Sequence, residues 1–167
     1  MGLYRAVTVL LLAGVWLGGC ATTTELRTTN GPTAEDLWKA KFRAVNLRGP
    51  NFDERHTFEQ QLDARVQEFL ARNPQVANSV RVSDLRFLRQ SKVGMTKDEI
   101  TLLLGKPQEV TDNPARMEVL ARKFWPEVKP QAKEAWIYPE GWTLYFDGDA
   151  LADITRYHRG VPHESAW

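Results

Sequence analysis

The sequence contains little cysteine and histidine. Cys20 is the one cysteine among 167 residues, and the three histidines are His56, His158 and His163. A single cysteine cannot form a disulfide within the chain, and no cysteine or carboxylate cluster joins the histidines to complete a metal site. We therefore expect no disulfide, no metal ion and no other cofactor.

An excess of charge of either sign is also missing. Lys and Arg number 22 and Asp and Glu 21, which gives a formal net charge of +1. Affinity for nucleic acid comes mainly from basic side chains that neutralise phosphates. We therefore expect no nucleic-acid partner.

No apolar run is long enough to span a bilayer as a helix. The longest, from Ala6 to Trp16, follows a short basic segment and fits the apolar region of a signal peptide. It ends in LGGC, with Cys20 last, and this ending resembles the lipobox of bacterial lipoproteins. The resemblance implies a signal peptide over residues 1–19 and lipidation at Cys20. An ordinary secretion signal beside an accidental cysteine is the alternative.

The lipobox resemblance also implies a location. In lipoproteins the cysteine carries several acyl chains, which together give stable membrane anchoring. Aspartate after the cysteine retains such proteins in the inner membrane, and this chain has Ala21 there. We expect a protein anchored in the outer membrane through its N-terminal lipid, with its folded part facing the periplasm.

The first half of the remaining chain favours helices. Residues 20–32 are small and polar and predict a flexible tether. Residues 33–82 predict a helical segment, with one helix from Thr33 to about Val45 and a second from Asp53 to about Arg72, each capped by its first residue. The expected apolar faces are Trp38, Phe42 and Val45 in the first helix and Phe58, Leu62, Val66, Phe69 and Leu70 in the second. Such a stripe is usually core, and a partner-binding groove is the alternative.

Residues 83–158 favour a mixed domain. A short helix over 83–90, capped by Ser83 with Leu85 and Leu88 turned inward, comes first. Strands are expected at Glu134 to Tyr138, at Trp142 to Phe146, where the pattern alternates, and at Ala150 to Tyr157 with a bulge. Turns at Pro139-Glu140-Gly141 and Asp147-Gly148 separate them. The fold class is therefore α+β, with helices on one face of a three-stranded antiparallel meander and extra N-terminal helices. Residues 159–167 form a tail.

Residues 93–107, VGMTKDEITLLLGKP, carry a helix start. Thr96 and Glu99 fit a capping box, in which each side chain bonds to the other residue's backbone N–H. Met95 before the cap and Ile100 after it can pack as a hydrophobic staple. The stretch therefore predicts a short helix with an apolar face.

The same stretch carries a helix stop. Gly105 is placed to end the helix in the left-handed conformation, and Pro107 prevents it from resuming. A phosphate-binding loop needs glycines and a lysine that open a helix, whereas here Gly105-Lys106-Pro107 closes one. Nucleotide binding is therefore not expected.

The motifs VGMT, LLGKP, AWIY, WTLYF and DGDALADI follow one another along the second half of the chain. Together they resemble the signature of the SmpA/OmlA (BamE-like) lipoprotein family. The matching positions are Gly94, Met95, Thr96, Leu104, Gly105, Pro107, Trp136, Tyr138, Leu144, Phe146, Gly148, Leu151 and Ile154. The resemblance implies a helix pair on three strands, without enzymatic activity, that supports the machine inserting β-barrel proteins by binding its subunits and lipid. Residues 33–82 and an insertion over 108–134 depart from the family pattern.

The insertion supplies a candidate partner surface. Residues Ala115 to Phe124 favour a helix, and the prolines after Trp125 resist regular structure. Exposed aromatic residues often mark contact sites, so Phe124 and Trp125 are candidates for partner binding. Covering the sheet is the alternative for both side chains.

Catalytic patterns are absent from the sequence. Ser79, Ser83 and Ser91 stand in no nucleophile elbow. Asp147, Asp149 and Asp153 lack the twelve-residue calcium-loop pattern, and we expect them at a hairpin turn and on a solvent face. A hydrolase would require an open pocket lined by titratable groups.

The combined expectation is a non-enzymatic outer-membrane lipoprotein that acts as a protein-binding scaffold in β-barrel protein assembly or envelope integrity. The alternative is a lipoprotein on the same fold that binds another envelope partner. Such a partner could be peptidoglycan, a stress factor or an enzyme that it inhibits.

Overall fold

The computed structural model describes residues 23–159. The predicted signal peptide, Cys20 and the tail beyond residue 159 lie outside the described residues. The α-helices are α1 (Ala34–Asn46), α2 (Phe52–Arg72), α3 (Pro74–Ala77), α4 (Arg81–Ser83), α5 (Lys97–Leu104), α6 (Pro114–Ala121) and α7 (Trp125–Val128). The strands are β1 (Thr23–Thr28), β2 (Asn30–Thr33), β3 (Gln90–Lys92), β4 (Glu109–Thr111), β5 (Glu134–Ile137), β6 (Trp142–Asp147) and β7 (Ala150–Arg159). A π-helical turn (Asp84–Leu88) and two 3-10 turns (Arg122–Phe124 and Pro139–Gly141) complete the order.

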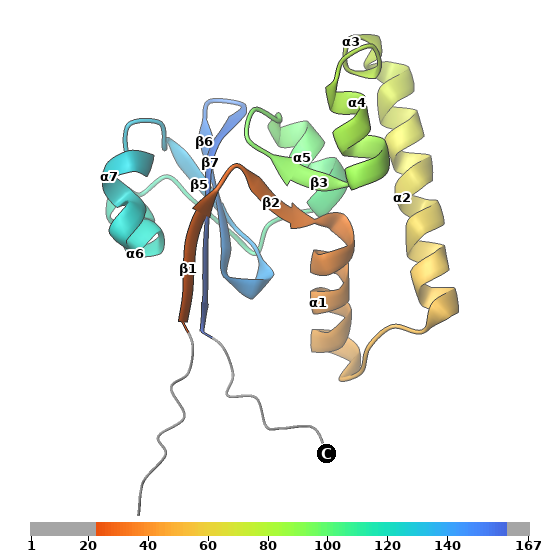
Figure 1. The fold of residues 1–167 in the computed structure, drawn as a ribbon, viewed down its shortest axis with the longest axis horizontal. Helices are drawn as coiled ribbons and strands as arrows, with labels where there is room; N and C mark the ends of the chain where they lie inside the picture. The colour runs from red at the N-terminus through yellow and green to blue at the C-terminus, as the bar shows by residue number, and fades with distance from the viewer. Residues whose placement is uncertain (1–22, 160–167) are drawn as a thin grey trace, which may run out of the picture.

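Five strands form one antiparallel sheet in the order β1-β7-β6-β5-β4, and β2 pairs with β3 in a separate ribbon (Figure 1). The α+β class is as predicted. The three predicted strands are β5, β6 and β7, which are successive neighbours in the sheet. The predicted three-stranded sheet is too small, however, because β1 and β4 extend it on either side.

β1 contradicts the predicted tether over residues 20–32. The strand pairs with β7 along its length, from Thr23 opposite Arg159 to Thr28 opposite Ile154. Threonine is β-branched and suits an extended, half-buried strand, so the composition of the segment is compatible with an edge strand. Its partner lies at the far end of the described chain, and local composition therefore did not reveal the pairing.

An ion pair joins the neighbouring strands β1 and β7. Arg27 in β1 donates from Nε to the carboxylate oxygens of Asp153 at 2.8 and 3.1 Å. Asp153 is buried, and its carboxylate also accepts the backbone N–H of Ile154 at 2.8 Å. The hydrogen bond that Arg27 donates to Asp153 raises the pKa of Arg27. Asp153 was expected on a solvent face, and this expectation is wrong because β1 covers it.

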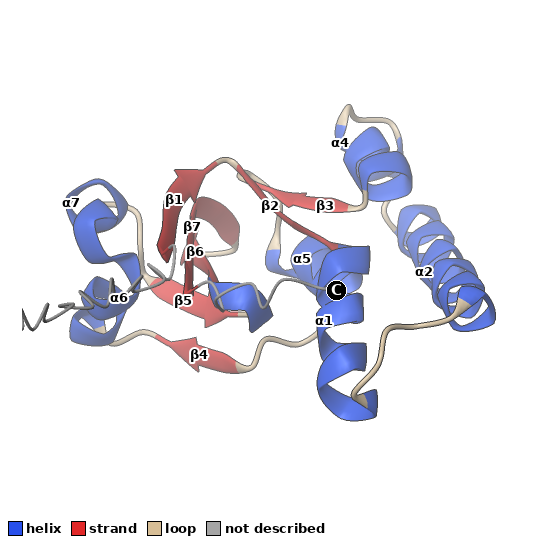
Figure 2. Cartoon of the chain, turned by 60° about the horizontal axis from the view of Figure 1, so that its bottom comes forward, coloured by secondary structure: helices blue, strands red, loops and turns tan. Residues whose placement is uncertain are grey.

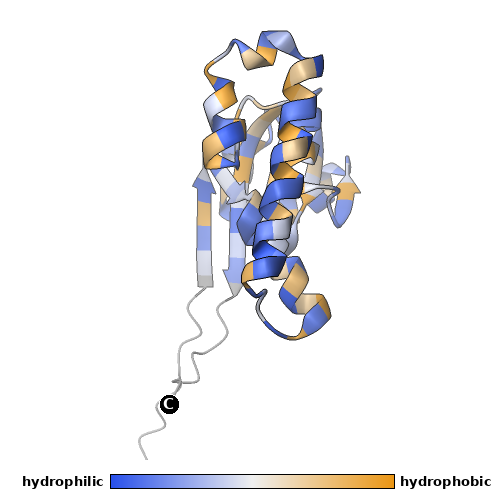
Figure 3. Ribbon diagram, turned by 90° about the vertical axis from the view of Figure 1, so that its right-hand side faces the viewer, coloured by the Kyte–Doolittle hydropathy of each residue, from blue (hydrophilic) through white to orange (hydrophobic). Residues whose placement is uncertain are grey.

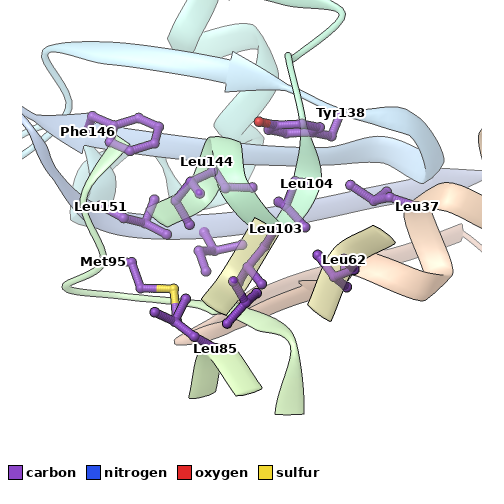
Figure 4. Close-up of a cluster of buried hydrophobic side chains, with 14 of the residues drawn as sticks. Leu37, Leu62, Leu85, Met95, Leu103, Leu104, Tyr138, Leu144, Phe146 and Leu151 are labelled. Atoms are coloured by element: carbon purple, nitrogen blue, oxygen red, sulfur yellow. The ribbon is translucent and has the colours of Figure 1, made fainter. Parts of the chain in front are cut away.

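A large core joins α1, α2 and α5 to β6 and β7 (Figure 4). The buried positions expected in α2 are confirmed for Leu62, Val66 and Leu70. In α1 the expected face is wrong: the buried residues are Ala34, Leu37 and Ala40, whereas Trp38 and Phe42 are half-buried and Val45 is exposed. The α1 helix is therefore turned so that its aromatic residues lie beside the core.

The opposite face of the sheet carries a second core. The insertion folds into β4, α6 and α7, and these two helices cover that face (Figures 1 and 2). The second core consists of Met117, Ala121, Trp125, Val128, Ala132, Ala135 and Tyr145. The prediction of helices on one sheet face is therefore wrong. Both faces of strand β6 are covered, because its central residues are all buried instead of alternating with exposed ones: Thr143, Leu144, Tyr145 and Phe146.

Two of the four predicted helix caps, Thr33 and Thr96, are confirmed. Thr33 caps α1 by accepting the N–H of Asp36, and the capping box of Thr96 and Glu99 is present at α5. The α2 cap is Asn51, not Asp53, and it forms a capping box with Glu54.

Two further local predictions fail around residues 83–90. Ser83 makes no side-chain cap bond, because the chain enters the π-helical turn directly from α4. Leu85 is fully buried as expected, but Leu88 is exposed. The wider π-helical turn changes the angular spacing of the two leucines, so both cannot point inward.

The hairpin from β6 to β7 follows the prediction. Gly148 has φ +62°, as a tight turn requires. The register shifts between Tyr145 and Phe146, so that Ala152 has no partner across the ladder. The predicted bulge is therefore confirmed.

Candidate binding groove

An open groove of about 550 Å³ lies between α1, α2 and α5. The lining is mostly apolar with a few polar side chains: Ala34, Trp38, Lys41, Phe58, Gln61, Ala64, Arg65, Leu103, Leu104 and Gly105. Its volume falls within the range of protein sites that hold a small molecule or a few side chains of a partner. The rotation of α1 described above creates the groove, because it leaves Trp38 at the surface.

Two stacked aromatic rings form one wall. The Trp38 and Phe58 rings lie nearly parallel, with centroids 4.5 Å apart and planes at 10°. Phe42 also packs against Trp38, with ring centroids 5.5 Å apart and planes tilted at 52°. All three side chains are half-buried. The wall is thus a rigid aromatic surface that is accessible to a partner.

The floor of the groove is the C-terminal end of α5. Lys41 Nζ reaches across from α1 and donates to the Leu104 carbonyl at 3.1 Å. The Tyr138 hydroxyl donates to the Gly105 carbonyl at 2.9 Å. Helix C-termini favour such donors, because their last carbonyls lack partners within the helix. Burial lowers the pKa of Lys41 and raises the pKa of Tyr138 well above its usual value.

The charge of the groove is positive. Among its lining residues the ionisable groups are Lys41 and Arg65, both cationic, and Gln61 adds an amide. No general acid or base of the carboxylate or imidazole type stands among them. The arrangement therefore suits recognition of an apolar group with a nearby acidic or carbonyl oxygen, and the lining set contains no nucleophile with its base.

The residues on which the predicted family resemblance rests act mainly in the fold. Met95, Tyr138 and Phe146 are buried in the large core (Figure 4). Thr96 caps α5, and the signature glycines have positive φ, with Gly94 at 92°, Gly105 at 72° and Gly148 at 62°. Gly105 has ψ −167°, so it ends the helix in an extended positive-φ conformation instead of the predicted left-handed one. Pro107 follows α5, as expected of a residue that prevents the helix from resuming.

Trp136 lies half-buried at the edge of the large core. Its ring packs at 4.7 Å from the Phe146 ring, and its indole N–H donates to Glu134. Lys97 bonds the other Glu134 oxygen at 2.8 Å and lies over both rings. The residue therefore has a structural role.

The predicted partner surface at Phe124 and Trp125 is not supported for the tryptophan. Trp125 is only 9% exposed and belongs to the second core, while Phe124 is half-buried against it. Pro126 occupies the first turn of α7, where its missing N–H costs nothing, so regular structure forms despite the proline. Covering the sheet is the correct alternative for Trp125.

The remaining candidate residues lie apart from the groove. His56 bonds Gln60, and His158 lies 3.7 Å from Glu140. No cluster of potential metal ligands occurs within residues 23–159, and His163 lies outside them. Asp147 and Asp149 are exposed at the hairpin, as expected. Ser79 and Ser91 donate to the backbone carbonyls of Val76 and Pro32, and Ser83 is exposed.

Comparisons with known proteins give no match: no protein-family model, curated protein or solved structure is significantly similar to the chain. Within the described residues, none of the helices has the length and apolar character to cross a bilayer.

The sequence contained only part of the signal for the groove. Trp38 and Phe58 were identified as members of apolar stripes, and a groove was the alternative for the α2 stripe. Their stacking, and the approach of Lys41 to the end of α5, depend on how three helices pack together.

Proposed function

We propose that this chain is a non-enzymatic outer-membrane lipoprotein that faces the periplasm and binds an envelope protein as a scaffold in β-barrel protein assembly or envelope integrity. The groove between α1, α2 and α5 carries the proposal. Its stacked Trp38 and Phe58 and its cationic Lys41 and Arg65 suit an apolar peptide segment that carries an acidic residue. Aromatic and arginine side chains dominate the energetics of many protein interfaces.

The anchor and the order of elements support the same proposal. The lipobox-like ending at Cys20 places a lipid attachment site three residues before β1. A capped helix, α5, precedes the successive antiparallel strands β5, β6 and β7, which is compatible with a BamE-like arrangement. The groove lies between α5, which belongs to this BamE-like order of elements, and the additional N-terminal helices α1 and α2.

Site-specific photocrosslinking tests the proposal directly. A photoreactive residue at Gln61, an exposed groove position, should crosslink to subunits of the barrel-insertion machine in living cells. Glu118, exposed on α6 beyond the opposite sheet face, is the matched control and should give no such product. Crosslinks from Gln61 only to peptidoglycan-associated proteins, a stress factor or an enzyme would favour the alternative partner.

A charge reversal tests the chemistry of the groove. Arg65→Glu should weaken partner binding at least tenfold, because it replaces a rim cation with an anion facing an acidic segment. Arg72→Glu is the matched control on the same helix, and its side chain is 70% exposed outside the groove. Equal binding by both variants, measured by co-purification, would contradict a cationic recognition site.

The anchor has its own test. Cys20→Ser should give a chain that carries no acyl groups and does not fractionate with the outer membrane. Unchanged fractionation would refute the anchor, and normal barrel-protein levels in a deletion strain would refute the assembly role.

A further inference from the structure

The connection between α1 and α2 exposes three large apolar side chains together. Val45, Leu47 and Phe52 are 81%, 89% and 78% exposed, and we name them the α1–α2 tip. Single exposed apolar residues are common on protein surfaces. Three within eight residues of one turn form a local apolar projection, which is typical of a contact site.

The tip is held in a defined conformation. Leu47 ends α1 with φ 55° and ψ 22°, the left-handed conformation that glycine or asparagine usually adopts. Its backbone N–H donates to the Arg43 carbonyl at 2.9 Å. A large side chain is therefore kept at a strained position where it contacts little of the protein. Such strain is typical of functional sites.

A second set of contacts fixes the other side of the turn. Arg48 bonds both carboxylate oxygens of Glu54 at 2.6 and 2.8 Å and lies over the Phe42 ring. Glu54 in turn completes the capping box with Asn51 at the start of α2. The apolar side chains thus stand on a turn whose polar groups are already satisfied by one another.

The tip lies at the end of the molecule where the described chain begins. In Figures 1 and 3, α1 runs down to the tip and α2 runs back up from it, and β1 starts at the same end. Cys20 is three residues before Thr23. Three residues of chain reach at most about 10 Å, so an acylated Cys20 holds this end of the fold beside the bilayer.

We propose that the α1–α2 tip inserts its apolar side chains into the surface of the bilayer that carries the lipid anchor. The inference rests on the proposed lipid anchor, and it adds a second membrane contact that fixes the orientation of the domain. Arg43, Arg48 and Arg55 surround the tip, opposed by Asp53 and Glu54. The local charge is only slightly positive, so apolar insertion outweighs attraction to anionic lipid. With two contacts the groove is held at a constant height above the membrane.

Fluorescence of a single labelled cysteine tests the insertion. Acylation leaves Cys20 without a thiol, so Leu47→Cys in the full chain gives one site for an environment-sensitive dye. The chain is reconstituted in vesicles of phosphatidylethanolamine and phosphatidylglycerol, some with nitroxide-labelled lipid. The dye at position 47 should be quenched at least threefold more than a dye on Val80→Cys. Val80 is equally exposed, at 89%. It lies in the connection between α3 and α4, which stand at the opposite end of the molecule in Figure 1.

The control variant separates insertion from structure. Leu47→Asn fits the left-handed conformation but is polar, so the chain should stay folded while quenching of a dye at Phe52→Cys falls several-fold. Equal quenching at positions 47 and 80 would overturn the proposal. If quenching rose with the density of protein on the vesicle and not with the amount of nitroxide-labelled lipid, the tip would contact a second copy of the chain. That result would also overturn the proposal.

The same samples distinguish failure of the tip from failure of the anchor. Mass spectrometry of the N-terminal peptide reports acylation independently of the dye. If Cys20 is not acylated, the anchor is refuted, and the proposal that rests on it falls with it. If Cys20 is acylated and positions 47 and 80 are quenched equally, the tip proposal alone is overturned and the anchor stands.

Discussion

Gly141, in the turn between β5 and β6, has almost no room for a side chain. A Cβ atom there would lie 1.6 Å from the carbonyl oxygen of Tyr157 and 2.6 Å from its carbonyl carbon. The residue also has φ +76°, a conformation that side chains disfavour. Gly141→Ala must therefore both strain its own backbone and push the turn away from β7.

The expected cost follows from these two effects. The positive φ contributes about 1–2 kcal/mol, and displacing the backbone adds about 1–3 kcal/mol, as for overpacking of a filled site. Gly148→Ala is the matched control, since φ is +62° and nothing lies within 4 Å of its Cβ position. Only the first effect applies there, so the control should lose about 1–2 kcal/mol.

Urea denaturation of the purified full chain in mild detergent, followed by tryptophan fluorescence, measures both variants. The midpoint should fall further for Gly141→Ala than for Gly148→Ala, with an unchanged slope. In thermal unfolding the difference should be roughly 2–12 °C for a chain of this size. Equal losses would show that the close approach of Tyr157 is not maintained in solution and would refute the steric argument.

Three further predictions concern stability. Arg48 lowers the pKa of Glu54 to about 2. The Arg48–Glu54 ion pair therefore stabilises the fold above pH 4.5, and this stabilisation is lost as the pH falls toward 2. The stability of Glu54→Gln should accordingly depend less on pH within that window than the stability of the parent chain. Asp153→Asn should cost about 1.5–3 kcal/mol in urea, because Arg27 loses a charged hydrogen bond; unchanged stability would contradict this role. Trp125→Ala should cost about 3–5 kcal/mol by leaving a cavity under α7, and a loss below 1 kcal/mol would show that the aromatic ring is not packed.

Features determined by neighbouring residues could be predicted from the sequence. The capping box at Thr96, the cap at Thr33, the Gly148 turn and the β7 bulge each depend on a few adjacent positions. Short side chains that bond their own backbone, and glycines at positive φ, act without help from the rest of the fold.

Features that depend on distant segments were missed. The sequence of β1 has no apolar alternation that would distinguish an edge strand from a polar linker, and its pairing appears only beside β7. Trp125 looked like an exposed aromatic in a proline-rich loop, but α6 and α7 fold it onto Tyr145 on the second sheet face. The side of a sheet to which an insertion returns is set by tertiary packing, not by local pattern.

The candidate groove likewise depends partly on local sequence and partly on how distant segments pack. The aromatic residues Trp38 and Phe58 were visible as parts of helical stripes, and periodicity placed both in helices. Whether such a residue is buried depends on the rotation of its helix against neighbours. In α1 small residues, Ala34 and Ala40, allow close packing, and the larger Trp38 is turned aside.

The pairing of β1 with β7 also has a consequence for how the chain folds. The two strands are separated by more than a hundred residues, as the Arg27–Asp153 bond spans 126 positions. A chain made from its N-terminus cannot complete this sheet until β7 has been synthesised, and closing so long a loop is slow. Until then β1 is an unpaired strand edge, open to association with other chains. The order of synthesis thus delays completion of the native sheet until the two ends of the described chain can meet.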